Sequence, residues 1–152
     1  MLDPLMRRLI DPPLRRAGGA IAARGISADA VTLMAFALGL AAVACVAAGW
    51  FWAALLLLLL NRLGDGLDGA VARHTLATDR GAFLDIVLDF IFYALMVLGF
   101  ALAMPGNAQA AAFLLAAFMA TAASFLAYAI LAGRRGLSTE RRGRKSFFHL
   151  GG

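Results

Sequence analysis

Four of the five aspartates between Asp65 and Asp89 are spaced so that they can act together. In a helix, Asp65 and Asp68 (i, i+3) share one face, and so do Asp85 and Asp89 (i, i+4). Burying several carboxylates together is costly unless a positive charge accompanies them. Carboxylate oxygens favour hard divalent ions such as Mg²⁺ or Mn²⁺. The spacing therefore predicts a divalent-metal site.

The two aspartate pairs also match in depth if their helices are antiparallel and joined by a turn over residues 74–80. At about 1.5 Å per residue, Asp68 and Asp85 each lie about 7.5 Å inside their helix ends. Asp65 lies about 12 Å and Asp89 about 13.5 Å inside by the same measure. The four carboxylates are therefore expected to meet in one small volume.

Glycines and one arginine near these aspartates indicate room for a ligand that bears phosphate. Gly64, Gly66 and Gly69 each cost a helix about 1 kcal/mol relative to alanine, and Gly81 opens the next helix. Together they let a bulky group approach the backbone. Arg73 lies at the mouth, where it can hold a phosphate.

The fifth aspartate, Asp79, is interpreted as part of a helix start. Aspartate is a favoured N-cap residue, so Asp79 is expected to cap the helix that follows, with Arg80 beside it. Both are left out of the candidate site.

The elements that carry these residues are expected to be membrane helices. The chain is 62% hydrophobic and 15% charged, which lies far from the balance of soluble domains. A spanning helix takes about 20 apolar residues, and four windows qualify, at about 28–49, 51–73, 81–103 and 107–132. The predicted fold class is an all-α, polytopic membrane helix bundle with four transmembrane helices.

The chain is expected to have three parts. Residues 1–27 read as a short amphipathic segment on the cytoplasmic face, broken at Pro12 and Pro13. Residues 28–132 form the transmembrane catalytic domain, and residues 133–152 form a basic cytoplasmic tail.

The 14 basic residues predict the orientation in the membrane. They lie before the first window, near the turn between the second and third, and after the fourth, whereas the connections at Trp50 and at 104–109 carry no charge. Because Lys and Arg accumulate in cytoplasmic segments, both termini and the aspartate-rich turn are expected on the cytoplasmic side. The net charge of +5 then reflects this bias and attraction to membrane lipids, and no nucleic acid partner is expected.

The aspartate segment resembles the signature of the CDP-alcohol phosphatidyltransferase family. That signature runs D-x-x-D-G-x-x-A-R, then about eight residues, then G-x-x-x-D-x-x-x-D, and this chain has "DGLDGAVAR" and "GAFLDIVLD" separated by seven residues. The shorter separation predicts a tighter turn. The likeness covers residues 26–135 in organisation and 65–89 in strict motif. All eight fixed positions are occupied, by Asp65, Asp68, Gly69, Ala72, Arg73, Gly81, Asp85 and Asp89.

The resemblance implies a metal-dependent membrane enzyme of phospholipid synthesis. Such an enzyme displaces CMP from a CDP-linked lipid, here CDP-diacylglycerol, and joins the phosphoryl group to an acceptor alcohol. The acceptor is left open among glycerol phosphate, inositol phosphate, serine and simpler alcohols. The resemblance also suggests a homodimer, and the expected location is the bacterial inner membrane.

Roles for single residues follow from the same resemblance. Three aspartates are similar to metal ligands for Mg²⁺ or Mn²⁺, and the fourth to the general base, which could also touch a second metal. Four further positions would bind the substrate, with the glycines clearing space for the CDP group. The expected ligands are Asp65, Asp68, Asp85 and Asp89, the base is Asp89, and the substrate-binding positions are Gly69, Ala72, Arg73 and Gly81.

Two alternatives stay open beside the enzyme. Members of the family usually have six spans, so this chain is expected to be a C-terminally short member or a fragment, and a short homologue can be a catalytically inactive assembly partner. The other alternative is a cation-coupled transporter that uses the aspartates as an ion path. Clustering of the acids near one membrane face argues against a transporter.

Overall fold

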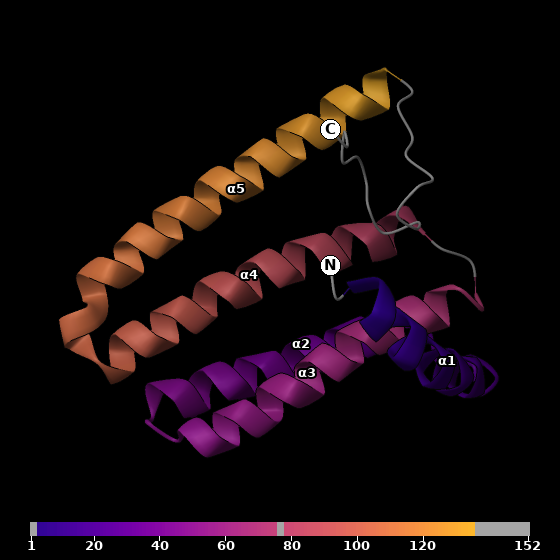
Figure 1. The fold of residues 1–152 in the computed structure, drawn as a ribbon, viewed down its shortest axis with the longest axis horizontal. Coiled ribbons are helices and arrows are strands. Elements are labelled where there is room, and N and C mark those ends of the chain that lie inside the picture. The colour runs from indigo at the N-terminus through magenta and orange to yellow at the C-terminus, as the bar shows by residue number, and fades with distance from the viewer. Residues whose placement is uncertain (1–2, 76–77, 136–152) are drawn as a thin grey trace. The chain divides into compact units, whose positions relative to one another are not determined.

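The computed structural model describes residues 3–75 and 78–135, and all regular structure in them is helical. The chain divides into two units, residues 1–108 and 109–152, each described by itself. Figure 1 shows the elements, and the predicted all-α fold class is confirmed. The elements are α1 (Asp3–Ala22), α2 (Ala28–Ala47), α3 (Phe51–Ala72), α4 (Asp79–Ala103), a short 3₁₀ helix (Pro105–Asn107) and α5 (Ala108–Arg134).

Three helical stretches are long and apolar enough to cross a membrane: α2, α4 and the stretch Pro105–Arg134 that contains α5. The α3 helix has 22 residues and is therefore about 33 Å long. Its second half carries Arg62, Asp65 and Asp68, which excludes it from the apolar class. The charged residues that exclude α3 from this class are thus candidate site residues or their neighbours.

Turn and cap residues define the ends of α2. Ser27 is the N-cap, and its hydroxyl oxygen accepts a hydrogen bond from the Ala30 N–H at 3.2 Å. Gly25 and Gly49 have φ values of +76° and +78°, which side-chain-bearing residues rarely adopt. These glycines let the chain turn from α1 into α2 and from α2 into α3.

The start of α4 corrects one prediction. Thr78, and not Asp79, is the N-cap, and its hydroxyl accepts a hydrogen bond from the Gly81 N–H at 3.0 Å. Asp79 lies in the first turn, where its negative charge favours the positive end of the helix dipole. Thr and Asp are both favoured N-cap residues. Because they are adjacent here, the sequence alone does not determine which of them caps the helix.

The N-terminal segment also differs from the prediction, because α1 continues through Pro12 and Pro13 instead of breaking there. Proline removes a helix hydrogen bond but its φ is compatible with a helix. Tertiary contact holds the following turns: a Cβ at Gly66 of α3 would lie 3.3 Å from Leu14, and one at Gly18 would lie 2.7 Å from Ala70. Packing against α3 therefore outweighs the local proline signal.

In the first unit, α2 packs against both α3 and α4, and α1 packs against α3. Figure 1 shows α2 and α3 running side by side. Small residues make this approach close, since a Cβ at Gly64 of α3 would lie 2.6 Å from the Cβ of Ala35 in α2. The aspartates of α3 are thus held against α2. Residues 76–77 of the predicted turn and 136–152 of the predicted tail lie outside the described residues.

Gly64→Ala is expected to destabilise the protein, although alanine favours a helix by about 1 kcal/mol. The new methyl group would meet Ala35 at 2.6 Å, and overpacking of this kind costs about 1–3 kcal/mol. Thermal unfolding in detergent measures the difference. Gly133→Ala in α5 is the matched control, because nothing lies within 4 Å of that Cβ and its stability should be unchanged or higher. Equal effects of the two changes would contradict the close α2–α3 contact.

Candidate active site

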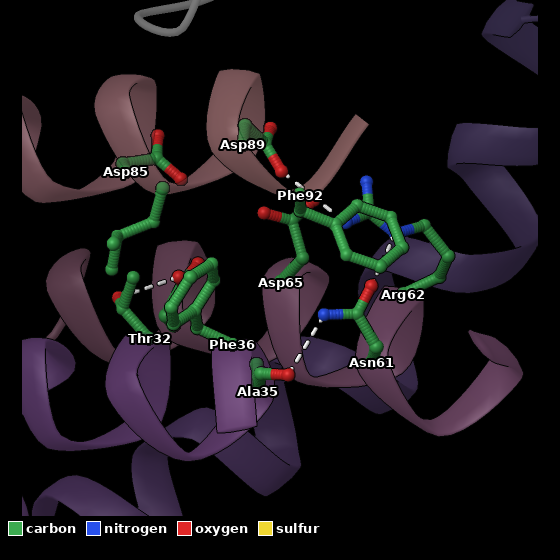
Figure 2. A pocket seen from close by; sticks show the side chains of 11 residues that line it. Thr32, Ala35, Phe36, Asn61, Arg62, Asp65, Asp85, Asp89 and Phe92 are labelled. Carbon is green, nitrogen blue, oxygen red and sulfur yellow. Dashed lines mark hydrogen bonds and ion pairs between the residues drawn. The ribbon is translucent and has the colours of Figure 1, made fainter. Parts of the chain in front are cut away.

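Three carboxylates meet between two helices. Asp65 and Asp68 of α3 and Asp85 of α4 each offer one oxygen, and these oxygens lie within 4.8 Å of one another. Figure 2 shows Asp85 and Asp89 extending from α4 toward the side of α3 that carries Asp65 and Arg62. A group of carboxylate oxygens at this separation is a donor set that suits a hard divalent cation.

The carboxylates line a pocket with α2, α3 and α4 around it. All four predicted aspartates belong to the lining, as the matched depths of the two pairs predicted. The roles predicted for them stay predictions. The lining residues are Thr32, Ala35, Phe36, Asn61, Arg62, Asp65, Asp68, Asp85, Leu88, Asp89 and Phe92.

Asp68 is the most deeply placed of the four and is only 4% exposed. The Thr32 hydroxyl, from α2, donates a hydrogen bond to Asp68 Oδ2 at 2.7 Å. The same hydroxyl lies 3.1 Å from the Ala28 carbonyl oxygen, but it has one proton and bonds to a charged acceptor are stronger. Thr32 therefore orients the carboxylate of Asp68.

Asp89 lies outside the group of three close carboxylates. Its Oδ1 accepts a hydrogen bond from Arg62 Nη2 at 3.2 Å, and the two side chains form an ion pair about one-third exposed. The family resemblance predicts two roles for Asp89, as base and as metal ligand. Asp89 is thus paired with a cationic side chain of α3.

Thr32, Asn61 and Arg62 line the pocket but are not among the predicted site residues. Arg62 was counted among the cytoplasmic basic residues, whereas it lies in α3, one helical turn before Asp65 and on the same face. This i, i+3 spacing is a signal that could have identified it. Asn61 lies four residues before Asp65 and so shares that face as well. No comparable signal marks Thr32, because its contact with Asp68 crosses between helices.

The four predicted substrate-binding residues lie at the C-terminal end of α3, just beyond Asp68, and at the start of α4. None of them lines the aspartate pocket. Arg73 caps the C-terminus of α3 and is exposed, and Ala72 is the last residue of that helix. Gly69 is half-buried one turn earlier. A Cβ at Gly81 would lie 2.9 Å from Asp29 Oδ1, so the hydrogen side chain here makes room for that carboxylate.

Asp29 itself is part of a polar pair at the same end of the bundle. Its Oδ2 lies 3.6 Å from Arg80 Nε, with the arginine largely exposed. An exposed pair contributes on the order of 0–1 kcal/mol to stability, so it serves mainly to bring the starts of α2 and α4 together.

The charge in the pocket favours a bound cation. Four carboxylates and the Arg62 guanidinium carry a formal charge of −3 when all are ionised, and such an excess is costly in an apolar bundle. One divalent ion reduces it to −1. The three close carboxylates fit that ion by chemistry and by spacing.

The sequence is similar to a known protein family and to individual known proteins. The sequence model of the CDP-alcohol phosphatidyltransferase family matches residues 26–149. The chain is 48% identical over 153 aligned residues to the inner membrane protein YnjF of Escherichia coli (strain K12), covering all of this chain and 74% of that relative. It is 36% identical over 97 residues to the archaetidylinositol phosphate synthase of Methanothermobacter thermautotrophicus, covering 63% of this chain and 46% of that enzyme. No solved structure gave a significant match.

Thr32→Val is expected to weaken binding of a divalent ion by about 10-fold, the lower end of the effect of losing a partner of a metal ligand. The change removes the hydroxyl that donates to Asp68 and nearly keeps its shape. Mn²⁺ titration of the purified chain, followed by electron paramagnetic resonance, measures the affinity. Thr32→Ser keeps the hydroxyl and should bind Mn²⁺ as the parent does. Parent-like affinity in the valine variant would show that Thr32 does not orient a ligand.

Proposed function

Because the chain belongs to the CDP-alcohol phosphatidyltransferase family, we propose that it is a phosphotransferase that displaces CMP from CDP-diacylglycerol with an acceptor alcohol. The observation that carries the proposal is the meeting of Asp65, Asp68 and Asp85 within 4.8 Å at a pocket that Asp89 also lines. These residues stand at four of the fixed positions of the family signature.

In the proposed reaction, the acceptor hydroxyl oxygen attacks the phosphorus atom that bears the lipid. The bond from that phosphorus to the CMP oxygen breaks, so CMP leaves and a phosphodiester lipid forms. The proton of the acceptor hydroxyl passes to the carboxylate of Asp89. A positioned base of this kind accelerates a reaction by about 10²–10⁴-fold.

Asp65, Asp68 and Asp85 are proposed to hold Mg²⁺ or Mn²⁺. When bound, the ion supplies positive charge that stabilises the diphosphate and the leaving CMP. Thr32 keeps Asp68 turned toward its partners. Asp89 is proposed to act chiefly as the base.

The substrate is proposed to approach from the end of the bundle that carries Gly69, Ala72, Arg73 and Gly81. Arg73 is exposed there, so its guanidinium can reach phosphate oxygens from the aqueous side. The archaeal relative is named as an archaetidylinositol phosphate synthase, which supports phosphotransfer as the reaction class. The acceptor of this chain is left to the assay.

The chain is an integral membrane protein, and we propose that both termini and the pocket mouth face the cytoplasm of the bacterial inner membrane. In a Cys45→Ala background, an impermeant maleimide added outside intact cells should label Trp50→Cys and not Arg24→Cys. The reverse pattern would invert the orientation. A homodimer and the three-part division of the chain stay predictions.

The purified chain in detergent is expected to release CMP from CDP-diacylglycerol when Mg²⁺ or Mn²⁺ and one acceptor alcohol are present. Asp89→Asn should slow release by about 10²-fold or more with binding of CDP-diacylglycerol nearly unchanged, because only the base is lost. Chromatographic measurement of CMP across a panel of acceptors gives both the rate and the product.

Asp11→Asn is the matched control, since Asp11 is exposed on α1 and lies outside the pocket. Arg73→Ala tests the approach of the substrate and should weaken binding of CDP-diacylglycerol. Parent-like turnover of Asp89→Asn would remove Asp89 as the base. Metal-dependent lipid binding with no CMP release would instead favour an inactive assembly partner.

A further inference from the structure

Arg62 is held on several sides within the pocket. Its Nε donates to Asn61 Oδ1 at 2.9 Å, its Nη1 to the Tyr93 hydroxyl at 3.1 Å, and its Nη2 to Asp89 Oδ1 at 3.2 Å. Its Cζ lies 4.9 Å from the ring centre of Phe92 and 5.4 Å from that of Tyr93. Hydrogen bonds and ring contacts together leave the guanidinium little freedom to turn.

The residue behind Arg62 is itself anchored to a third helix. Asn61 is 3% exposed, and its Nδ2 donates to the Ala35 carbonyl oxygen of α2 at 2.8 Å. Gly39 of α2 makes room, since a Cβ there would lie 2.7 Å from Phe92 and 3.0 Å from the Asn61 amide nitrogen. A continuous series of contacts therefore runs from α2 through Asn61 and Arg62 to Asp89 on α4. Figure 2 shows Arg62 between Asn61 and Asp89.

We infer that Arg62 is the positioning residue for Asp89: it fixes the Asp89 carboxylate through Oδ1 and holds it apart from the three close carboxylates. The inference rests on the proposed function, in which Asp89 takes the proton of the acceptor. With Oδ1 engaged by Arg62, that proton is received at Oδ2. The contact thus sets Asp89 apart from the three carboxylates that lie close enough together to hold a metal ion.

Two features favour positioning over a simple structural ion pair. Lysine would supply the same charge, but only a guanidinium can direct Nε to Asn61 and Nη2 to Asp89 at once. Arg62 is also the basic residue that lines the pocket, so its position coincides with the reacting groups and not with a helix end.

The kinetic test compares Arg62→Met and Arg62→Lys with Arg24→Met, an exposed arginine outside the pocket. Arg62→Met should lower kcat by about 10–100-fold, because a misplaced catalytic group costs up to about 10²-fold. The KM values for CDP-diacylglycerol and acceptor should stay within about twofold. Arg62→Lys should recover part of the rate, and Arg24→Met should leave it unchanged. A raised acceptor KM with unchanged kcat would overturn the inference and make Arg62 an acceptor-binding residue.

A second comparison of rates tests whether the contribution of Asp89 depends on Arg62. Asp89→Asn should cost far less rate in the Arg62→Met background than in the parent chain, because a base already misplaced contributes little. Equal costs in both backgrounds would overturn the inference. If Arg62→Met does not fold, the same comparison is made in Arg62→Lys.

Mn²⁺ affinity provides a test that does not depend on turnover. In the parent, Asp89→Asn should change Mn²⁺ affinity by less than about threefold, since Asp89 is held by Arg62. In Arg62→Met, Asp89 is released toward the metal group, so Asp89→Asn should lower affinity by about 10-fold, as loss of a ligand partner does. Equal effects in both backgrounds would overturn the inference. Absence of CMP release by the parent chain would reject the proposed function while this measurement still reports on Asp89.

Discussion

The structure depends on the cost of gathering negative charge among apolar helices. Four carboxylates line one pocket in a chain that is 62% hydrophobic, and water is scarce where helices pack. Different polar groups offset the cost of burying this negative charge. A hydroxyl from α2 contacts Asp68, a guanidinium contacts Asp89, and the close group of three offers its oxygens to an ion. Without such contacts, burying these carboxylates together would be costly.

The helix without pocket acids organises this arrangement. Thr32, Ala35 and Gly39 of α2 are spaced three and four residues apart and so lie on one face. Thr32 bonds to an aspartate of α3, Ala35 accepts from Asn61, and Gly39 admits the Phe92 ring of α4. An apolar span with small residues thereby determines how two charged helix segments face each other.

Sequence periodicity predicted much of this molecule because the relevant signals are local. The helix ranges fell within about two residues of those observed, an ordinary uncertainty for helix ends, and the pairing of acids by depth followed from helix rise alone. What a local signal could not predict are the contacts between distant segments. Thr32 and Asp68 are 36 positions apart and Asn61 and Ala35 are 26 apart, so one sequence does not indicate that they meet. Likewise, contacts of Gly18 and Leu14 with α3 outweighed the two prolines of α1.

The close contact of Ala35 with Gly64 has a consequence for how such a protein can change over evolutionary time. Asp65 follows Gly64 directly, and Asp68 lies one turn further on the same stiff rod. A methyl group gained or lost at the contact between Gly64 and Ala35 therefore shifts Asp65 and Asp68 together relative to Asp85 on α4. Ions differ in radius by only tenths of an ångström. Substitutions between small apolar residues at this contact can therefore change the separation of the three carboxylates while all three aspartates stay in place.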